Sequence, residues 1–239
     1  MQRQQFETIL RSRIVESAQA LHQSGVSFAT FDTTRCNPQF WELTEEGGCR
    51  IKAGITPAQG IRDIFINGQQ YAFECATAMV IVLYKGVLDS ILETEFNRIF
   101  ADMLLYDWHY DSDLRLIQQQ GSHKAVPGDI LYFNNPDVSS DALEWKGENV
   151  VKMKDDLFYG HGIGLLPAQG IIDSLNRHRR PDATVSAYLT NEVIYPDFVY
   201  LSQFAPEGNR FGISVNAFYH QEFSHSIHAV IGGRRFIQE

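Results

Sequence analysis

The stretch that decides the fold is YAFECATAMVIVLY, residues 71–84. From Phe73 to about Leu92 the apolar character continues for too long to form one strand, and Ala, Met and Leu occur among the Val and Ile residues. This pattern predicts a buried helix with Cys75 in its first turn. A segment that only packs has no need of a carboxylate at its start. The adjacent residues Glu74 and Cys75 therefore raise the question of a chemical role.

Further helices are predicted on both sides of this segment. Thr56 and Pro57 suit the N-cap and the first position of a helix over residues 57–66. Residues 95–100 extend or follow the Cys75 helix, and LPAQGIIDSLNRHRRP, residues 166–181, has a proline near each end. An N-terminal helix that ends near Gly25 is predicted from apolar residues at spacings of three and four. These residues are Phe6, Ile9, Leu10, Ile14, Ala18 and Leu21.

Strands are predicted mainly after residue 100, where short aromatic and β-branched segments alternate with turn signals. The expected antiparallel sheet consists of residues 104–110, 129–136, 145–153 and 157–166. Short strands are also expected at 27–32, 39–43 and 49–54, and the tail from about residue 185 should add strands, with alternation at 210–218 and 226–236. We therefore expect an α+β fold in a single domain, residues 1–239, in which the Cys75 helix packs on the sheet.

Composition excludes several classes of protein. The formal net charge of −9 and the scattered basic residues give no electrostatic footprint for nucleic acid. No segment has the 18 or so apolar residues of a membrane span, and the N-terminal residues lack the apolar region of a signal peptide, so cytoplasmic synthesis is expected. Three cysteines without CxxC spacing argue against a disulfide framework and structural zinc. We expect no cofactor and no metal, including at His220, His225 and His228.

The three cysteines differ in their expected role. Free cysteine usually acts as a small buried hydrophobe, and this is the expectation for Cys36 and Cys49. Cys75 differs because the first turn of a helix offers unpaired backbone N–H groups and the positive end of the helix dipole, which lower a thiol pKa. Position alone therefore makes Cys75 the candidate nucleophile.

Five motifs carry a family resemblance. They are YAFECATA at 71–78, LYDWHY at 105–110, GDILYFNNP at 128–136, WKGENV at 145–150 and YGHGIG at 159–164. Their order and spacing resemble the protein-glutamine gamma-glutamyltransferases of bacilli, the spore-coat transglutaminases. The resemblance covers about residues 10–190, and the tail at 190–239 has no motif of the family.

The resemblance implies a fold, a reaction and a location. The fold is an NlpC/P60-like, papain-related core, and the reaction is calcium-independent cross-linking of protein glutamine and lysine side chains. Spore-coat proteins are the implied partners, and the spore coat is the implied location. By motif, Cys75 matches the nucleophile, Glu148 the essential carboxylate and Glu74 the auxiliary carboxylate.

The expected chemistry is acyl transfer through a Cys75 thioester, with Glu148 as general base. Reference pKa values separate a thiol from a glutamate by about four units, so burial has to close this gap. His161, and after it His109, are alternative partners of the thiol, and Glu74 could instead interact only with the helix dipole. The backbone N–H of Cys75 is the expected oxyanion donor, with the second donor unidentified. Aromatic residues expected to line a substrate tunnel, or else to be core, are Trp108, Trp145, Tyr71 and Phe73.

Two other functions compete with this one. A cysteine peptidase or amidase of the same fold class would use Cys75 and His161 for hydrolysis. A non-catalytic coat protein would keep the fold and tolerate replacement of Cys75 and Glu148.

Overall fold

The computed structural model describes residues 2–206, 227–231 and 234–238 of the chain. The chain divides into two compact units, residues 1–205 and 206–239. In the second unit, β12 (Ile227–Ile231) and β13 (Arg234–Gln238) pair as an antiparallel hairpin. The alternating segment 210–218 lies outside the described residues. The boundary between units falls after Ala205, so residues 190–205 belong to the first unit and not to a separate tail.

The predicted helices are present in the first unit. The bounds are α1 (Gln2–Gln23), α2 (Pro57–Ile66), α3 (Cys75–Leu88), α4 (Glu93–Ile99), α5 (Ala168–Asn176) and a short α6 (Phe198–Leu201). Thr56 caps α2 as predicted, because its hydroxyl accepts a hydrogen bond from the backbone N–H of Gln59. The apolar run around Cys75 divides at Asp89, the C-cap of α3, and continues as α4.

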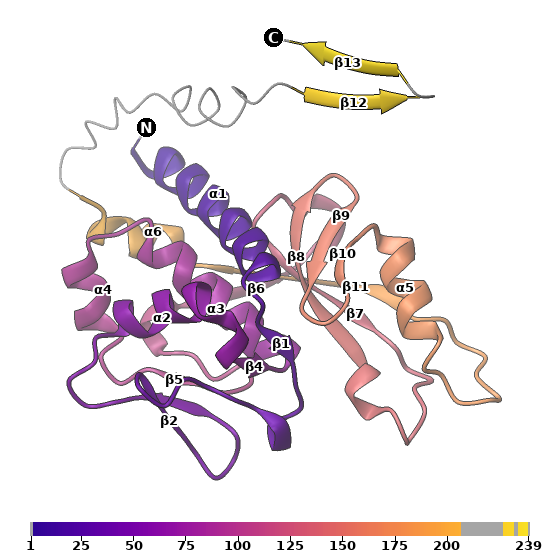
Figure 1. Ribbon diagram of the computed structural model, residues 1–239, viewed down its shortest axis with the longest axis horizontal. Coiled ribbons are helices and arrows are strands. Elements are labelled where there is room, and N and C mark those ends of the chain that lie inside the picture. Colours follow the sequence, from indigo (N-terminus) through magenta and orange to yellow (C-terminus); the bar gives the residue numbers. More distant parts are fainter. Residues whose placement is uncertain (1, 207–226, 232–233, 239) are drawn as a thin grey trace. The chain divides into compact units, whose positions relative to one another are not determined.

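The core lies between α1, α3 and a β-sheet (Figure 1). The apolar face of α1 is buried at the predicted spacing, through Phe6, Leu10, Ile14, Ala18 and Leu21. Helix α3 is buried on nearly all sides, as its composition predicts. The two helices approach closely at Gly86, where a Cβ atom would lie 2.8 Å from Cγ1 of Ile14. Each fully buried Leu or Ile in this core contributes about 1.5–3 kcal/mol.

The main sheet has six strands in the order β10-β9-β8-β7-β11-β6, and every pair is antiparallel. Their bounds are β6 (Leu116–Gln120), β7 (Ile130–Asn134), β8 (Gly147–Lys154), β9 (Leu157–Gly160), β10 (Gly164–Leu166) and β11 (Tyr188–Pro196). The antiparallel sheet is therefore confirmed, with β6 as a strand that the sequence analysis missed. Strand β11 enters the sheet between β7 and β6, so chain order and spatial order differ.

The remaining strands form two small sheets. Strands β2 (Trp41–Leu43), β3 (Cys49–Ile51) and β5 (Leu104–Leu105) pair antiparallel, and β1 (Ser27–Phe28) pairs in parallel with β4 (Ala72–Phe73). Residues 104–110 were expected in the main sheet. Only Leu104 and Leu105 form a strand there, and that strand pairs with β3 instead.

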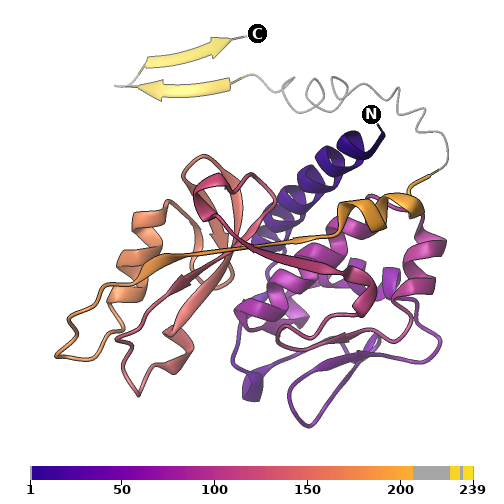
Figure 2. The same cartoon turned by 180° about the vertical axis from the view of Figure 1, so that it is seen from behind.

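The two faces of the main sheet have different neighbours. Helices α1 and α3 lie on one face and α5 lies on the other, as Figures 1 and 2 show. Tyr132 of β7 pairs with Asn149 of β8, and Phe133 pairs with Glu148. Because side chains alternate along a strand, Glu148 and Asn149 leave β8 on opposite faces. Phe133 packs in the cluster beneath α5, which places Glu148 on that side.

Candidate active site

The first turn of α3 positions the thiol of Cys75. Strand β4 leads directly to Glu74, the N-cap residue, and Cys75 is the first residue of the helix. The carboxylate of Glu74 accepts hydrogen bonds from the backbone N–H of Ala76, at 2.7 Å, and of Thr77. A side-chain cap of this kind contributes about 0.5–2 kcal/mol. Glu74 therefore fixes the start of the helix, and with it the position of Cys75.

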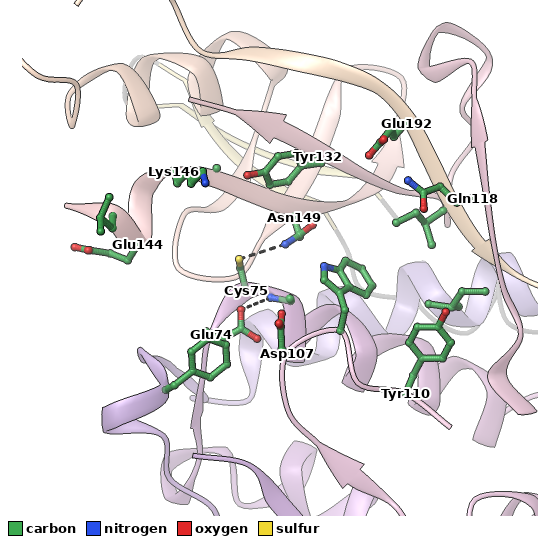
Figure 3. Close-up of a pocket in the computed structure, with 17 residues that line it drawn as sticks. Glu74, Cys75, Asp107, Tyr110, Gln118, Tyr132, Glu144, Lys146, Asn149 and Glu192 are labelled. Carbon is green, nitrogen blue, oxygen red and sulfur yellow. Dashed lines mark hydrogen bonds between the residues drawn. The ribbon is translucent and has the colours of Figure 1, made fainter. Parts of the chain in front are cut away.

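Cys75 lines a cavity of about 700 Å³ between the start of α3 and the main sheet. The side-chain amide of Asn149 donates a hydrogen bond to Sγ of Cys75 over 3.4 Å, and Figure 3 shows the two side chains facing each other. Glu192 and Gln118 lie toward one end of the cavity in this view, and Glu144 and Lys146 lie toward the other. Side chains that line the cavity with Cys75 include Phe31, Glu74, Asp107, Trp108, Tyr110, Leu116, Tyr132 and Ile194.

Glu148 is buried beside this cavity and does not line it. Glu148 is only 4% exposed, and its Oε1 has no hydrogen-bond partner among the described residues. The carboxyl group extends over Gly160 of β9, where a Cβ atom would lie 2.6 Å from Oε1. Glycine at position 160 therefore leaves the space that Glu148 occupies. A buried, unpaired carboxyl oxygen is unusual in a folded protein and suggests a functional constraint.

The charges of the site act strongly on the thiol. Burial, and after it the negative charges of Glu148 and Glu74, raise the pKa of Cys75 to about 12, and hydrogen bonds from Asn149 act in the opposite direction. The expectation that the helix N-terminus lowers the thiol pKa was wrong in its net effect, because desolvation and two carboxylates outweigh the dipole. Burial also raises the pKa of Glu148 well above its usual value, and the charge of Glu74 adds to this effect.

The expected histidine partners lie elsewhere. His161 is buried, its Nε2 is 3.1 Å from the carbonyl oxygen of Ser27, and its Nδ1 is 3.1 Å from the hydroxyl of Tyr159. A carbonyl oxygen only accepts, so Nε2 carries the proton and Nδ1 accepts from Tyr159. Burial lowers the pKa of His161 to about 4, so the ring is neutral near pH 7. Both ring nitrogens are thus occupied away from Cys75. His109 is exposed and does not line the cavity.

Only one of the four aromatic residues expected at the cavity lines it, and this is Trp108. Tyr71 and Phe73 are completely buried in the core, where Tyr71 donates a hydrogen bond to Asp63. Trp145 stacks on His178, with ring centroids 3.9 Å apart. The prediction that these three residues line the cavity was wrong. Tyr71 and Phe73 lie in the core, and Trp145 contacts His178.

Comparison with known proteins identifies the family. A sequence profile described as "Protein-glutamine gamma-glutamyltransferase" matches residues 1–205. The chain belongs to the protein-glutamine gamma-glutamyltransferase family. The family match extends beyond the expected 10–190 and coincides with the first structural unit.

Two relatives and one solved structure show how similar this transglutaminase is to others. A protein-glutamine gamma-glutamyltransferase of Bacillus pumilus is 48% identical over 83% of this chain and 80% of its own. That of Bacillus mycoides is 48% identical over 84% of this chain and 72% of its own. The structure "Transglutaminase from Geobacillus stearothermophilus (without C-terminal extension)" is 50% identical with a TM-score of 0.83, covering 86% of this chain and 98% of that chain.

Membership of the family confirms the protein-glutamine gamma-glutamyltransferase activity that the motifs predicted. The enzyme transfers the γ-glutamyl group of a protein-bound glutamine, so its substrates are proteins. Among the described helices, none is both long and apolar enough to cross a bilayer.

Asn149 is the residue of the site that the sequence analysis missed. It belongs to the motif WKGENV, in which attention fell on its acidic neighbour Glu148. Alternation along a strand means that only one of these two adjacent residues faces Cys75, but the sequence does not show which one. Phe31, Leu116 and Ile194 of the cavity come from separate elements, and no local motif connects them with Cys75.

Proposed function

We propose that this enzyme joins protein glutamine and lysine side chains by ε-(γ-glutamyl)lysine bonds, through a Cys75 thioester and without calcium, during assembly of a spore coat. The observation that carries the chemical proposal is the position of Cys75. Its thiol lines a cavity at a helix N-terminus, and the charge of the buried Glu148 carboxyl raises the pKa of this thiol. The spore coat and its proteins, as location and partners, follow from the family resemblance. The NlpC/P60-like, papain-related core is proposed on the same basis, and a cysteine helix packed on an antiparallel sheet supports it.

The reaction begins with attack of Sγ of Cys75 on the carboxamide carbon of a glutamine. The thiol proton passes to Glu148, which returns it to the departing ammonia as the thioester forms. A lysine amine then attacks the thioester carbon and gives a proton to Glu148. The bond between this carbon and Sγ breaks, the isopeptide product leaves, and Sγ receives the proton from Glu148. Each step uses a nucleophile, a carboxyl group or a proton that the chain and its two substrates supply.

Glu148 suits the role of proton carrier better than the other candidates. Burial raises its pKa above that of an ordinary glutamate, which makes its carboxylate a stronger proton acceptor, and Oε1 has no hydrogen-bond partner among the described residues. The carboxylate of Glu74 already holds two backbone N–H groups, and His161 has both ring nitrogens occupied. Glu148 leaves β8 on the side of α5 and makes no hydrogen bond with Cys75 in the described part of the chain, so the proposed proton transfer requires movement of the carboxyl group or one intervening water when substrate binds. Glu74 contributes mainly as the helix cap and as a negative charge beside the thiol.

The experiment follows incorporation of an amine into a glutamine-bearing protein together with ammonia release, in the presence of a calcium chelator. We expect wild-type turnover to persist with chelator and to be abolished in Cys75→Ala. In Glu148→Gln, loss of the general base should reduce turnover by about 10²–10⁴-fold. His161→Ala should retain most activity if it folds, and Cys36→Ala is the matched cysteine control.

Each alternative function predicts a different result. Ammonia release without amine incorporation would identify a hydrolase. Survival of activity in Glu148→Gln together with its loss in a folded His161→Ala would assign the base to histidine. Absence of turnover in every protein, including wild type, would favour a non-catalytic coat protein, and loss of activity with chelator alone would disprove calcium independence.

A further inference from the structure

We infer that the side-chain amide of Asn149 and the backbone N–H of Cys75 together form the oxyanion hole of this enzyme. The inference rests on the proposed thioester mechanism and adds a catalytic residue to it. In that mechanism the carbonyl oxygen of glutamine becomes negatively charged when Sγ attacks. Hydrogen-bond donors already aimed at that oxygen supply one of the largest contributions to catalysis of acyl transfer.

The amide of Asn149 is positioned at the reacting sulfur. Its Nδ2 lies 3.4 Å from Sγ of Cys75, and this thiol is its only partner among the described residues. An amide nitrogen carries two protons, so a second donor proton remains available in the cavity. The oxyanion forms two bonds away from Sγ, which brings it within the reach of a group that already contacts the sulfur.

The strand around Asn149 holds this amide in place. Asn149 is 8% exposed and lies in β8, where its neighbour Tyr132 in β7 shares the same face of the sheet and also lines the cavity. A side chain on a central strand has little freedom to move, because β7 and β9 flank β8. The donor is therefore arranged before the substrate binds, as an oxyanion hole requires.

The second donor follows from how α3 begins. The first N–H groups of a helix have no partner within the helix. Glu74 satisfies those of Ala76 and Thr77, while the N–H of Cys75 has no hydrogen-bond partner in the described part of the chain. This N–H belongs to the residue that carries Sγ. The helix end thus leaves free the one backbone donor next to the nucleophile.

An alternative role for Asn149 is to stabilise only the thiolate. Its hydrogen bonds act to lower the pKa of Cys75, so its removal would make the thiol less reactive toward any electrophile. The two roles differ in one respect. Alkylation of the thiol by iodoacetamide displaces iodide from carbon and forms no oxyanion, whereas attack on glutamine forms one.

The test compares these two reactions in Asn149→Ala and Asn149→Asp. Acyl transfer should fall by about 10²–10³-fold in both, as for removal of one oxyanion donor. In Asn149→Ala, alkylation of Cys75 by iodoacetamide should change by less than about 10-fold, because only one hydrogen bond to the thiol is lost. Asn149→Asp keeps the shape of the side chain and removes the donor, so a loss in both variants is not a packing effect. Thermal unfolding verifies that the variants are folded.

The matched control is Asn134→Ala, because Asn134 lies in the adjacent strand β7 and donates to the hydroxyl of Tyr188, 3.3 Å away. Its transfer activity should equal that of wild type. Alkylation that falls in the same proportion as transfer would overturn the inference, and so would unchanged transfer in folded Asn149→Ala. Failure of the proposed function is distinguishable, since wild type itself would then show no transfer.

Discussion

The start of α3 and the start of β8 both supply groups to the site, but the polar side chains at these two places differ in how well they are paired by hydrogen bonds. At the helix end the carboxylate of Glu74 is paired with two backbone N–H groups, so its polar groups support the fold. At the strand, and among the described residues, Glu148 is buried with an unpaired carboxyl oxygen, and the side-chain amide of Asn149 has only a thiol as partner. Polar groups that are buried and poorly paired lower stability, so they indicate where the chain retains residues for chemistry.

This difference separates two carboxylates that look alike in the sequence. Glu74 is adjacent to the nucleophile and serves the helix, whereas Glu148 is 73 positions away in the chain and acts on the thiol through its charge. Sequence proximity to Cys75 is therefore a poor guide to the role that we propose for each carboxylate. Three predictions test this division between the helix end and the strand.

The largest effect is expected for Glu148→Gln, whose pH dependence of stability should differ from that of wild type. The pKa of Glu148 is raised by folding, so its contribution to stability is complete below the unfolded pKa, about 4.3, and is lost as pH rises toward the folded pKa. Each unit of this shift is worth about 1.4 kcal/mol. The free energy of unfolding of wild type relative to Glu148→Gln, measured by urea denaturation, should therefore fall as the pH rises above the unfolded pKa. A constant difference as the pH rises would show that Glu148 is not perturbed.

A smaller effect is expected for Gly160→Ala, which changes the site without touching the cavity. The new Cβ atom would lie 2.6 Å from Oε1 and 2.9 Å from Cγ of Glu148, so the carboxyl group must move. Misplacement of a catalytic group by about 1 Å can reduce turnover by up to about 10²-fold, and we expect at least a 10-fold loss in kcat. Gly170→Ala in α5 is the control, because its Cβ atom would approach no atom closer than 3.3 Å. Equal activity of the two variants would remove Glu148 from the reaction.

The smallest effect is expected for Glu74→Ala, which removes the helix cap. The free energy of unfolding should fall by about 0.5–2 kcal/mol, since the N–H groups of Ala76 and Thr77 lose their partner. Turnover should decrease less than in Glu148→Gln, and Glu74→Asp should retain part of the cap. Thermal unfolding and amine incorporation measure the two quantities. Activity lost to the same extent as in Glu148→Gln, at unchanged stability, would contradict the structural role of Glu74.

Local signals predicted much of the fold. The cap at Thr56 and the apolar spacing of α1 gave two helices correctly, because both signals lie within the element itself. Strand β6 escaped prediction because its sequence LIQQQ has little apolar alternation and its pairing with β11 is a long-range contact. Propensity alone carries no information on such a partner.

The site was predicted less completely than the fold. Cys75 is in the predicted first turn of a helix, and Trp108 is at the cavity. Tyr71 and Phe73 were placed at the cavity because they precede Cys75, yet Phe73 of β4 and Tyr71, directly before this strand, both lie in the core. Their true surroundings depend on the pairing of β4 with β1, which joins residues far apart in the chain. The spacing of residues near Cys75 does not contain this information.

The position of β11 between β7 and β6 also determines when the site is completed during synthesis. Strand β6 pairs only with β11 among the described strands, and Ile194 of β11 lines the cavity beside Leu116 of β6. The ribosome makes Cys75 more than a hundred residues before β11. A nascent chain that ends before residue 188 therefore carries the nucleophile without one wall of its cavity. An enzyme that links proteins covalently thus acquires its complete binding site only when nearly the whole first unit has left the ribosome.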